Sequence, residues 1–514
     1  MHQGRKKRVL RSNIALGHSQ LLRVHVMSKF QRLATFVHLP QIIELNKAKD
    51  RQIMLRGATL LSMDPHVGDL EVGDILIRGS KIVAIDRDLS SMVSDVVLTL
   101  DAHGYVITPG MQDAHRHCWY GQCRRTLPDV SDVREYFSLF YHTLTPAFTP
   151  EDIYVGTLVS ALSAIDSGVT NIHDVLTNNR TADHGDAGIA ALCDAGIRGT
   201  HVQFGSLTGD DAKHWPNDLV RVQREFFGRS NQLLTLRLGV LGSADMVPED
   251  VVIGRRAIEF ARSLDIGITT DAVAGPSTSR NIEELGRAGL LGEDVLFTHC
   301  LDLTDDAWQF ISDNGVGVAI TATSDSRFGL LNSISPIQKC IDFGISRVGI
   351  GIDTEINLKP DLFSQMEAAV TIQRMLIFNR RYLEGRNDLQ GLSLKDVFSW
   401  ATISGARATG SDKTVGSLTP GKEADLVAFN VQNINNIPLN NAYGAVVGSS
   451  GTRDVEMVMI GGNIRKWDGE LVDVDLEALR ARAEASRDEL YAKGNMERRA
   501  FSNPVVKEAA PVQR

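Results

Sequence analysis

Residues 109–117 read Pro-Gly-Met-Gln-Asp-Ala-His-Arg-His and overlap the end of an apolar, β-rich run, Tyr105–Met111. His115 and His117 stand two positions apart, so on a strand their side chains face the same way and both imidazoles can reach one ion. Imidazole is a common ligand of zinc, iron and nickel. A His-x-His pair also arises by chance, so the pattern needs support from the rest of the chain.

Further runs of the same kind follow along the chain. The eight runs are Tyr105–Met111, Gly168–Val175, Arg198–Gly205, Leu233–Gly242, Ile266–Ala272, Asp294–Cys300, Gly315–Thr321 and Arg347–Asp353. Helix-like stretches lie between them, such as Glu151–Ser167 and Asn281–Leu291, where apolar residues recur near helical spacing. Eight alternating strand–helix units predict an α/β fold, a (β/α)8 TIM barrel. A doubly wound open sheet is the alternative.

Short strands are predicted on both sides of this barrel. Asp74–Arg78 and Lys81–Ile85 flank the turn sequence Gly79-Ser80, and Ala424–Asn430 and Val455–Ile460 resume the pattern near the C-terminus. We therefore expect a small β-sandwich domain built from two distant segments.

The predicted domains follow from these patterns. They are a basic, flexible extension at residues 1–53, the small β domain at 54–106 and 412–472, the barrel at 107–411, and a terminal amphipathic helix with a tail at 473–514.

Composition narrows the class of protein. The chain has 514 residues, 43% of them apolar, which is ordinary for a globular protein and excludes disordered, collagenous and disulfide-stapled chains. No run approaches the ~18 apolar residues of a membrane helix, so we expect no membrane partner. Residues 1–53 carry eleven basic and two acidic residues, which leaves a net charge of −18 on the rest. An acidic body argues against nucleic-acid binding.

The cysteines and the basic segment bear on location. The five cysteines are odd in number and form no Cys-x-x-Cys pair, which favours a reducing, cytoplasmic location. Residues 1–53 are interpreted as a loose extension, and a mitochondrial transit peptide is the alternative because the segment is rich in arginine and poor in acids.

Polar side chains stand where the predicted strands end. His299 follows Val295–Thr298, and Asp353 follows Val348–Ile352. Asp353 alone could cap a helix, and His299 alone could be a core side chain. In a barrel, however, reactive groups gather at the C-terminal ends of the strands. His-x-His, His and Asp at the ends of strands one, six and eight therefore point to one metal site.

These residues carry a resemblance to a known family. The chain resembles the amidohydrolase superfamily, in particular its cytosine-deaminase-like and triazine-hydrolase-like branch, over about residues 54–490. The motifs are Pro109-Gly110…Asp113-Ala-His115-Arg-His117, Gly168-Val-Thr170, Thr298-His299-Cys300, Gly349-Ile-Gly351-Ile-Asp353, Ser404-Gly-Ala-Arg-Ala and Val415-Gly-Ser-Leu-Thr-Pro-Gly-Lys-Glu-Ala-Asp425-Leu-Val. The resemblance implies that His115, His117 and Asp353 hold a divalent metal and that His299 contacts the metal, its water or the substrate.

The fifth strand departs from the family pattern. The family places a histidine near Ile268–Ala272, and Asp271 is the obvious occupant here. The glutamate that deaminases of this branch carry three residues later is replaced by Ala274. A set of two imidazoles with Asp271 and Asp353 would formally neutralise a divalent ion and make it a weaker Lewis acid. Zinc is expected first, with iron and manganese as alternatives. Asp271 could instead be a loop carboxylate without metal contact.

The expected mechanism uses a water that a metal makes acidic. Asp353 accepts the proton as general base and later returns it to the leaving group, while His299 stabilises the developing oxyanion.

Substrate contacts are expected from residues near the strand ends. Trp119 could form an aromatic wall, with core packing as the alternative. His173 could face the pocket or pair within the barrel wall. Arg124 could bind an anionic group or lie solvated on the surface. Asp325-Ser-Arg327 is a further candidate loop.

The predicted function is hydrolysis of a non-peptide C–N bond in a small cyclic or aromatic compound, by deamination or by ring or amide hydrolysis. Loss of the usual glutamate favours an alternative on the same site, namely dechlorination, decarboxylation or lyase chemistry. A third hypothesis is a pseudoenzyme that only binds a ligand or partner, which Asp271 and Ala274 support. Members of this branch often form homodimers, so a second copy of the chain is the expected protein partner.

Overall fold

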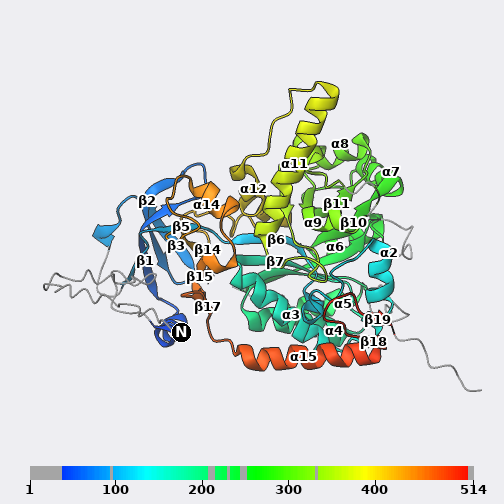
Figure 1. Ribbon diagram of the computed structural model, residues 1–514, viewed down its shortest axis with the longest axis horizontal. Helices are drawn as coiled ribbons and strands as arrows, with labels where there is room; N and C mark the ends of the chain where they lie inside the picture. The colour runs from blue at the N-terminus through cyan, green and yellow to red at the C-terminus, as the bar shows by residue number, and fades with distance from the viewer. Residues whose placement is uncertain are drawn as a thin grey trace, which may run out of the picture.

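The computed structural model describes residues 38–92, 97–205, 215–228, 232–242, 252–329, 331 and 334–506. At its centre, eight parallel strands close into a barrel in the order β10-β11-β12-β13-β6-β7-β8-β9 (Figure 1). Their bounds are β6 Met111–Arg116, β7 Val169–Leu176, β8 Arg198–Gln203, β9 Leu234–Leu241, β10 Gly267–Ala274, β11 Val295–Leu301, β12 Gly317–Ile320 and β13 Val348–Ile350. The predicted TIM barrel is confirmed, and the open sheet is excluded.

Helices follow the strands and cover the barrel. They are α2 Val133–Tyr136, α3 Pro150–Asp166, α4 Ala182–Ala195, α5 Asp218–Phe226, α6 Arg255–Ser263, α7 Gly275–Arg287, α8 Asp305–Asp313, α9 Ala322–Arg327, α10 Ile337–Asp342, α11 Leu362–Glu384, α12 Leu394–Trp400, α13 Ile403–Thr409, α14 Ala442–Gly448 and α15 Leu476–Lys493. The terminal helix α15 lies along α3 (Figure 1), where Ser486 donates to Asp152 at 2.6 Å. Within the described residues, no helix has both the length and the apolar content that a bilayer crossing needs.

One of the eight predicted barrel strands belongs elsewhere. The run Tyr105–Met111 is mostly β5 (Tyr105–Pro109), which pairs with a strand outside the barrel. The first barrel strand is β6, which begins at Met111. β6 contains Gln112, Asp113, His115 and Arg116, all buried. A strand of such polarity does not look like a core strand in the sequence, because part of its polar groups is satisfied by distant partners, such as Glu355 for Arg116.

Nine of the remaining strands form one sheet, while β18 (Met496–Glu497) and β19 (Val505–Val506) pair separately. Its order is β17-β16-β15-β14-β5-β1-β2-β3, with β4 also paired to β1. The bounds are β1 Gln52–Leu60, β2 Leu70–Arg78, β3 Lys81–Asp86, β4 Val97–Asp101, β14 Leu426–Asn430, β15 Val455–Ile460, β16 Asn463–Trp467 and β17 Glu470–Leu471. The predicted union of two distant segments is confirmed. The structure corrects the expected sandwich, because hydrogen bonds join these strands into a single sheet. β1 connects its parts: it pairs with β4 along Gln52–Arg56 and with β5 at Thr59–Leu60.

The middle of this sheet is buried on both faces. Along β14, Leu426 and Ala428 pack into the core of the small domain, whereas Val427 and Phe429 pack into the core of the barrel. Successive strand residues face opposite sides, so an apolar run without polar alternation is what a shared wall requires. The sheet thus fixes the small domain to the barrel.

The small domain begins earlier than predicted. Residues 39–47 form helix α1 (Leu39–Lys47), and Ile42 is fully buried in the small-domain core. The side chain of Asn46 pairs with both backbone groups of Ile464 at 2.9 Å. Residues 38–53 are therefore part of the fold rather than of a flexible extension, because an apolar helix face covers the sheet. Residues 1–37 lie outside the described chain.

Candidate active site

Five side chains from four strand ends meet at the C-terminal mouth of the barrel. His115 and His117 come from the end of β6, Asp271 from β10, His299 from β11 and Asp353 from the segment after β13. Nε2 of His115 lies 3.6 Å from Asp271 and 3.5 Å from Asp353, and Nε2 of His117 lies 3.5 Å and 3.3 Å from the same carboxylates. Nε2 of His299 lies 3.2 Å from Asp271. All five are buried.

Hydrogen bonds at the far side of each ring fix how the imidazoles point. Nδ1 of His117 donates to the carbonyl of Val175 at 2.8 Å, and Nδ1 of His299 lies 2.8 Å from Asp325. Each ring therefore turns its Nε2 toward the common point. Backbone or carboxylate partners of this kind orient metal-binding histidines in proteins.

The charges of the site depend on one another. Burial opposes ionisation of Asp353, but the close approach of His115 and His117 and the charge of His299 hold its pKa well below the usual value. The pKa of Asp271 is lowered in the same way, against its burial. Burial also opposes protonation of His299, yet contacts with Asp271 and Asp325 raise its pKa well above the usual value. The two carboxylates thus stay ionised and call for a compensating positive charge.

The donor set fits a divalent cation. Two groups of three residues, His115 with His117 and Asp353, and His115 with Asp271 and His299, place their ligand atoms within 4.8 Å of one another. Nε2 of His115 is buried and has no hydrogen-bond partner among the described residues. Imidazoles with carboxylates suit zinc, iron and manganese. A cation at this point would satisfy the unpaired nitrogen and balance both carboxylates.

Backbone contacts hold two of the ligand-bearing segments together. The amide of Asp353 donates to His115 at 2.9 Å, and the amide of His117 donates to Asp353 at 2.8 Å. The backbone of both His299 and Asp353 has a positive φ, 71° and 66°, which residues other than glycine rarely adopt. Strain of this kind, of order 1–3 kcal/mol per residue, gathers at functional sites where surrounding contacts enforce it.

A small cavity opens over these side chains. It has a volume of about 90 Å³ and is lined by His117, Val133, Tyr136, Phe137, Tyr141, Thr177, Leu241, Asp271, Ala272, His299, Phe328 and Asp353. Apart from the metal-site residues, most of the side chains that line the cavity are aromatic or aliphatic. Four lining residues come from α2 and the π-helical segment Phe137–Tyr141 that continues it. Single π-helical turns of this kind are frequent at functional sites.

The comparisons with known proteins agree with this arrangement. Residues 256–465 match the model of the amidohydrolase family. This match to the amidohydrolase family covers less than half of the chain. Its 5'-deoxyadenosine deaminase relative from Methanosarcina mazei is 25% identical over 457 residues, which cover 86% of this chain and 99% of the relative. A 5-methylthioadenosine/S-adenosylhomocysteine deaminase from Desulforamulus reducens is 24% identical, over 83% and 96%. The family expected from the sequence motifs is confirmed.

Solved structures share the fold of this chain. A zinc-bound adenosine deaminase from Xanthomonas campestris superimposes with a TM-score of 0.73 at 19% identity, covering 86% of this chain and 99% of that chain. Atrazine chlorohydrolase from Arthrobacter aurescens, complexed with zinc, gives 0.70 at 21% identity, covering 84% and 99%. At these identities the likeness establishes the architecture.

Two residues predicted to contact substrate, Trp119 and Arg124, do not line this cavity. Trp119 is fully buried and packs edge-on against Tyr120 and Phe148, with ring centroids 4.4 and 5.1 Å away, so it belongs to an aromatic core beside the cavity. Arg124 donates to Glu355 and, at 3.1 Å, to the carbonyl of Val159. Its guanidinium forms an ion pair with the buried Glu355. The sequence alone could not distinguish an arginine in such an ion pair from one that binds an anionic substrate group.

His173 also lies elsewhere than predicted. It is 1% exposed on β7, and its Nε2 pairs with Oγ1 of Thr269 at 2.8 Å inside the barrel. Burial, helped by the charge of Arg237, lowers its pKa well below the usual value. The prediction of a substrate contact is corrected because the ring points into the barrel core and does not line the cavity.

Some functional positions were missed in the sequence. Asp325 was read as part of a substrate loop, but it accepts from Thr321 at 2.9 Å and Ser335 at 2.8 Å and holds His299. Tyr136 and Tyr141 were not singled out at all. The aromatic richness of residues 133–141 was the available signal, but nothing local places that segment over the strand ends.

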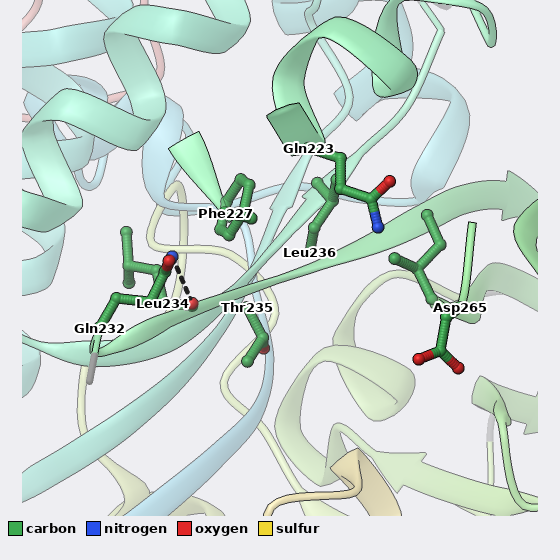
Figure 2. A pocket seen from close by; sticks show the side chains of 8 residues that line it. Gln223, Phe227, Gln232, Leu234, Thr235, Leu236 and Asp265 are labelled. Carbon is green, nitrogen blue, oxygen red and sulfur yellow. Dashed lines mark hydrogen bonds between the residues drawn. The ribbon is translucent and has the colours of Figure 1, made fainter. Parts of the chain in front are cut away.

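A second hollow lies at the opposite end of the barrel, where β9 and β10 begin. It measures about 340 Å³, and Gln223, Thr235 and Asp265 contribute polar groups to its lining (Figure 2). Only Asp265 among its lining side chains carries a charge. Without a set of converging ligands or paired acids, this hollow offers no comparable chemistry.

Proposed function

We propose that this protein is a metal-dependent enzyme that hydrolyses a non-peptide C–N bond of a small cyclic or aromatic compound, by deamination or by ring or amide hydrolysis. The observation that carries the proposal is the convergence of three imidazoles and two ionised carboxylates on one point below an aromatic cavity. The family match and the deaminase relatives support it.

Four residues would hold the metal: His115, His117, Asp271 and Asp353, with His299 beside them. Zinc is proposed first, because related folds contain it. When bound, such a cation supplies the Lewis acidity that brings the pKa of water from ~15.7 toward neutrality. Two carboxylates in the set reduce that acidity compared with an all-histidine site.

The protein's own groups would then move the proton. Oδ1 of Asp353 faces the imidazoles, and its Oδ2 accepts a hydrogen bond from Ser324. In the proposed reaction Asp353 takes the proton of the attacking water and returns it to the leaving nitrogen. His299, held at Nδ1 by Asp325, donates from Nε2 to the atom that develops negative charge, which is the carbonyl oxygen in amide hydrolysis and the ring nitrogen in deamination.

The test is a metal determination followed by an assay of ammonia release. Purified full-length protein should contain about one divalent ion, and it should release ammonia from part of a panel of aminated heterocycles. Chelator should abolish release, and zinc or manganese should restore it. His115→Ala is the matched inactive control. Bound metal with release of chloride or carbon dioxide instead would favour the alternative reactions, and absence of metal would favour the pseudoenzyme.

We also propose a homodimer. The second half of α11 projects beyond the barrel (Figure 1), and Met375, Phe378 and Tyr382 are 67%, 54% and 88% exposed. Their spacing of three and four places them on one helix face. Two copies packed antiparallel about a twofold axis would set Met375 against Phe378, as a self-complementary interface requires. Light scattering should give twice the chain mass, and Phe378→Glu should give the monomer; a monomeric parent protein would refute the dimer.

A cytoplasmic location stays a prediction. All five cysteines lie in the described part of the chain and are free thiols, as a reducing compartment favours.

A further inference from the structure

Among the described residues, the cavity wall outside the metal-site residues carries hydroxyl groups but no charged anchor. Among the described residues that line it, the polar side chains outside the metal site are Tyr136, Tyr141 and Thr177. No lysine or arginine is among them. An anionic substituent buried here would lie near Asp271 and Asp353 without a counterion, which costs several kcal/mol.

The hydroxyl groups are linked to one another and keep spare capacity. The hydroxyl of Tyr141 lies 3.0 Å from Oγ1 of Thr177, and that of Tyr136 lies 3.3 Å from the hydroxyl of Tyr120. The two lining rings meet edge to face at 5.3 Å. Each hydroxyl offers one donor and two acceptor sites, and these contacts do not exhaust them. The pair can therefore donate to, or accept from, a neutral group in the cavity.

Residue 274, where deaminases of this branch carry a glutamate, contributes no polar group to the cavity wall. Residue 274 is alanine, and the residue of β10 that lines the cavity beyond Asp271 is Ala272. The polar contact for a substrate must then come from the opposite side, from the segment that contains Tyr136 and Tyr141. Burial raises the pKa of both phenols, so they remain protonated donors.

Size restricts the ligand as well. The cavity of about 90 Å³ is smaller than the ~300–1,000 Å³ of pockets for drug-sized ligands. One planar ring can stack beside Phe137 and Phe328. A purine nucleoside, with two fused rings and a pentose, is much larger.

Resting on the proposed function, we infer that Tyr136 and Tyr141 determine specificity by hydrogen-bonding the uncharged polar edge, a ring carbonyl or ring nitrogen, of a single-ring substrate. The opposite edge of that ring faces the metal-site residues that line the cavity, His117, Asp271, His299 and Asp353. The substrate class is thus a neutral, planar, one-ring heterocycle, without a carboxylate or phosphate and without a sugar.

The experiment measures equilibrium binding of probes that have no leaving group, so turnover plays no part. Zinc-loaded full-length protein is titrated by calorimetry with pyrimidin-2-one, with pyrimidine, which lacks the carbonyl, with the 5-carboxylate of pyrimidin-2-one, and with its riboside. Pyrimidin-2-one should bind about 3- to 10-fold tighter than pyrimidine, because one additional hydrogen bond raises affinity by about that factor. The carboxylate and the riboside should bind at least about 10-fold more weakly than pyrimidin-2-one.

Variants then assign the effect to the hydroxyls. Tyr141→Phe should bring the ratio between pyrimidin-2-one and pyrimidine close to 1 while leaving pyrimidine affinity unchanged, whereas a merely structural defect would weaken both. Tyr136→Phe is the second variant. Tyr154→Phe is the matched control, because its hydroxyl bonds Asp194 on an exposed helix. Val133→Lys should favour the carboxylate at least about 10-fold, since it adds the missing cation.

The results that overturn the inference are separate from those that overturn the proposed function. A riboside or carboxylate that binds as tightly as pyrimidin-2-one, an unchanged ratio in both Tyr→Phe variants, or no saturable binding of pyrimidin-2-one would each refute the role of the two tyrosines. If the binding pattern holds but no aminated heterocycle releases ammonia, the specificity inference stands and the hydrolytic function fails.

Discussion

Replacing Glu355 with glutamine should destabilise the fold by about 3 kcal/mol at pH 7, because it leaves the buried Arg116 and the partly buried Arg124 without their shared carboxylate. Glu355 is fully buried and accepts from Nη2 of Arg116 at 2.6 Å, from Nε of Arg124 and from the hydroxyl of Ser160. Arg116 is fully buried too and would keep Asp113, at 3.2 Å, as its carboxylate partner, beside hydrogen bonds to Ser160 and to the carbonyl of Pro360.

Two routes give the same magnitude. Removing one partner of a buried ion pair costs about 3–5 kcal/mol. Burial opposes ionisation of Glu355, but the charges of Arg124 and Arg116 and their hydrogen bonds lower its pKa from 4.5 to about 2. That shift corresponds to about 3 kcal/mol of stability. Because the folded pKa lies below the unfolded one, the contribution is complete above pH 4.5 and is lost as the pH falls toward 2.

Urea unfolding at several pH values tests this reasoning. The difference in the free energy of unfolding between the parent protein and Glu355→Gln should be about 3 kcal/mol at pH 7 and should shrink steadily below pH 4.5. Glu489→Gln is the control, since Glu489 pairs with Lys493 on the surface and its loss should cost less than about 0.5 kcal/mol. A difference below 1 kcal/mol at pH 7, or one that does not change with pH, would refute the assignment of the ion pair.

Three further substitutions probe the site and its surroundings. Asp271→Ala should weaken zinc binding more than about 100-fold in competition with a chelating dye, because a ligand is lost outright; unchanged affinity would remove Asp271 from the metal set. Asp325→Asn should lower kcat about 10- to 100-fold with metal content intact, because it loosens His299; equal loss of metal would assign it a purely structural role. Trp119→Ala should cost about 3–5 kcal/mol of stability in urea unfolding, through the cavity it leaves in the aromatic core, and a stable variant with altered ligand affinity would restore the substrate-wall hypothesis.

The barrel strands and the candidate metal ligands could be predicted from the sequence, because each is marked by a pattern within a few residues. Seven of the eight barrel strands appear as apolar, β-rich runs, and each is buried on both faces by its own neighbours. His115 and His117 share a face because a strand has a period of two, and His299 and Asp353 reveal themselves by ending apolar runs. Asp271 was found from the family pattern, and the structure brings it to within 3.6 Å of three imidazoles.

Contacts between segments that lie far apart in the chain could not be predicted from the sequence. β6 is a buried strand rich in polar residues, and its Arg116 is paired with Glu355, more than two hundred positions away. Trp119 and Arg124 have side chains that suit a binding pocket as well as a core or an ion pair, and only their neighbours in space decide between the two.

The amino-acid sequence by itself thus determined which strands form and which side chains end them, since both depend on periodicity within a few residues. The tertiary structure alone decided what covers those ends: it placed Tyr136 and Tyr141 over the carboxylates and Asp325 behind His299. The physical reason is that burial and hydrogen-bond pairing are properties of a site shared by several segments, and no single segment contains the information about its partners.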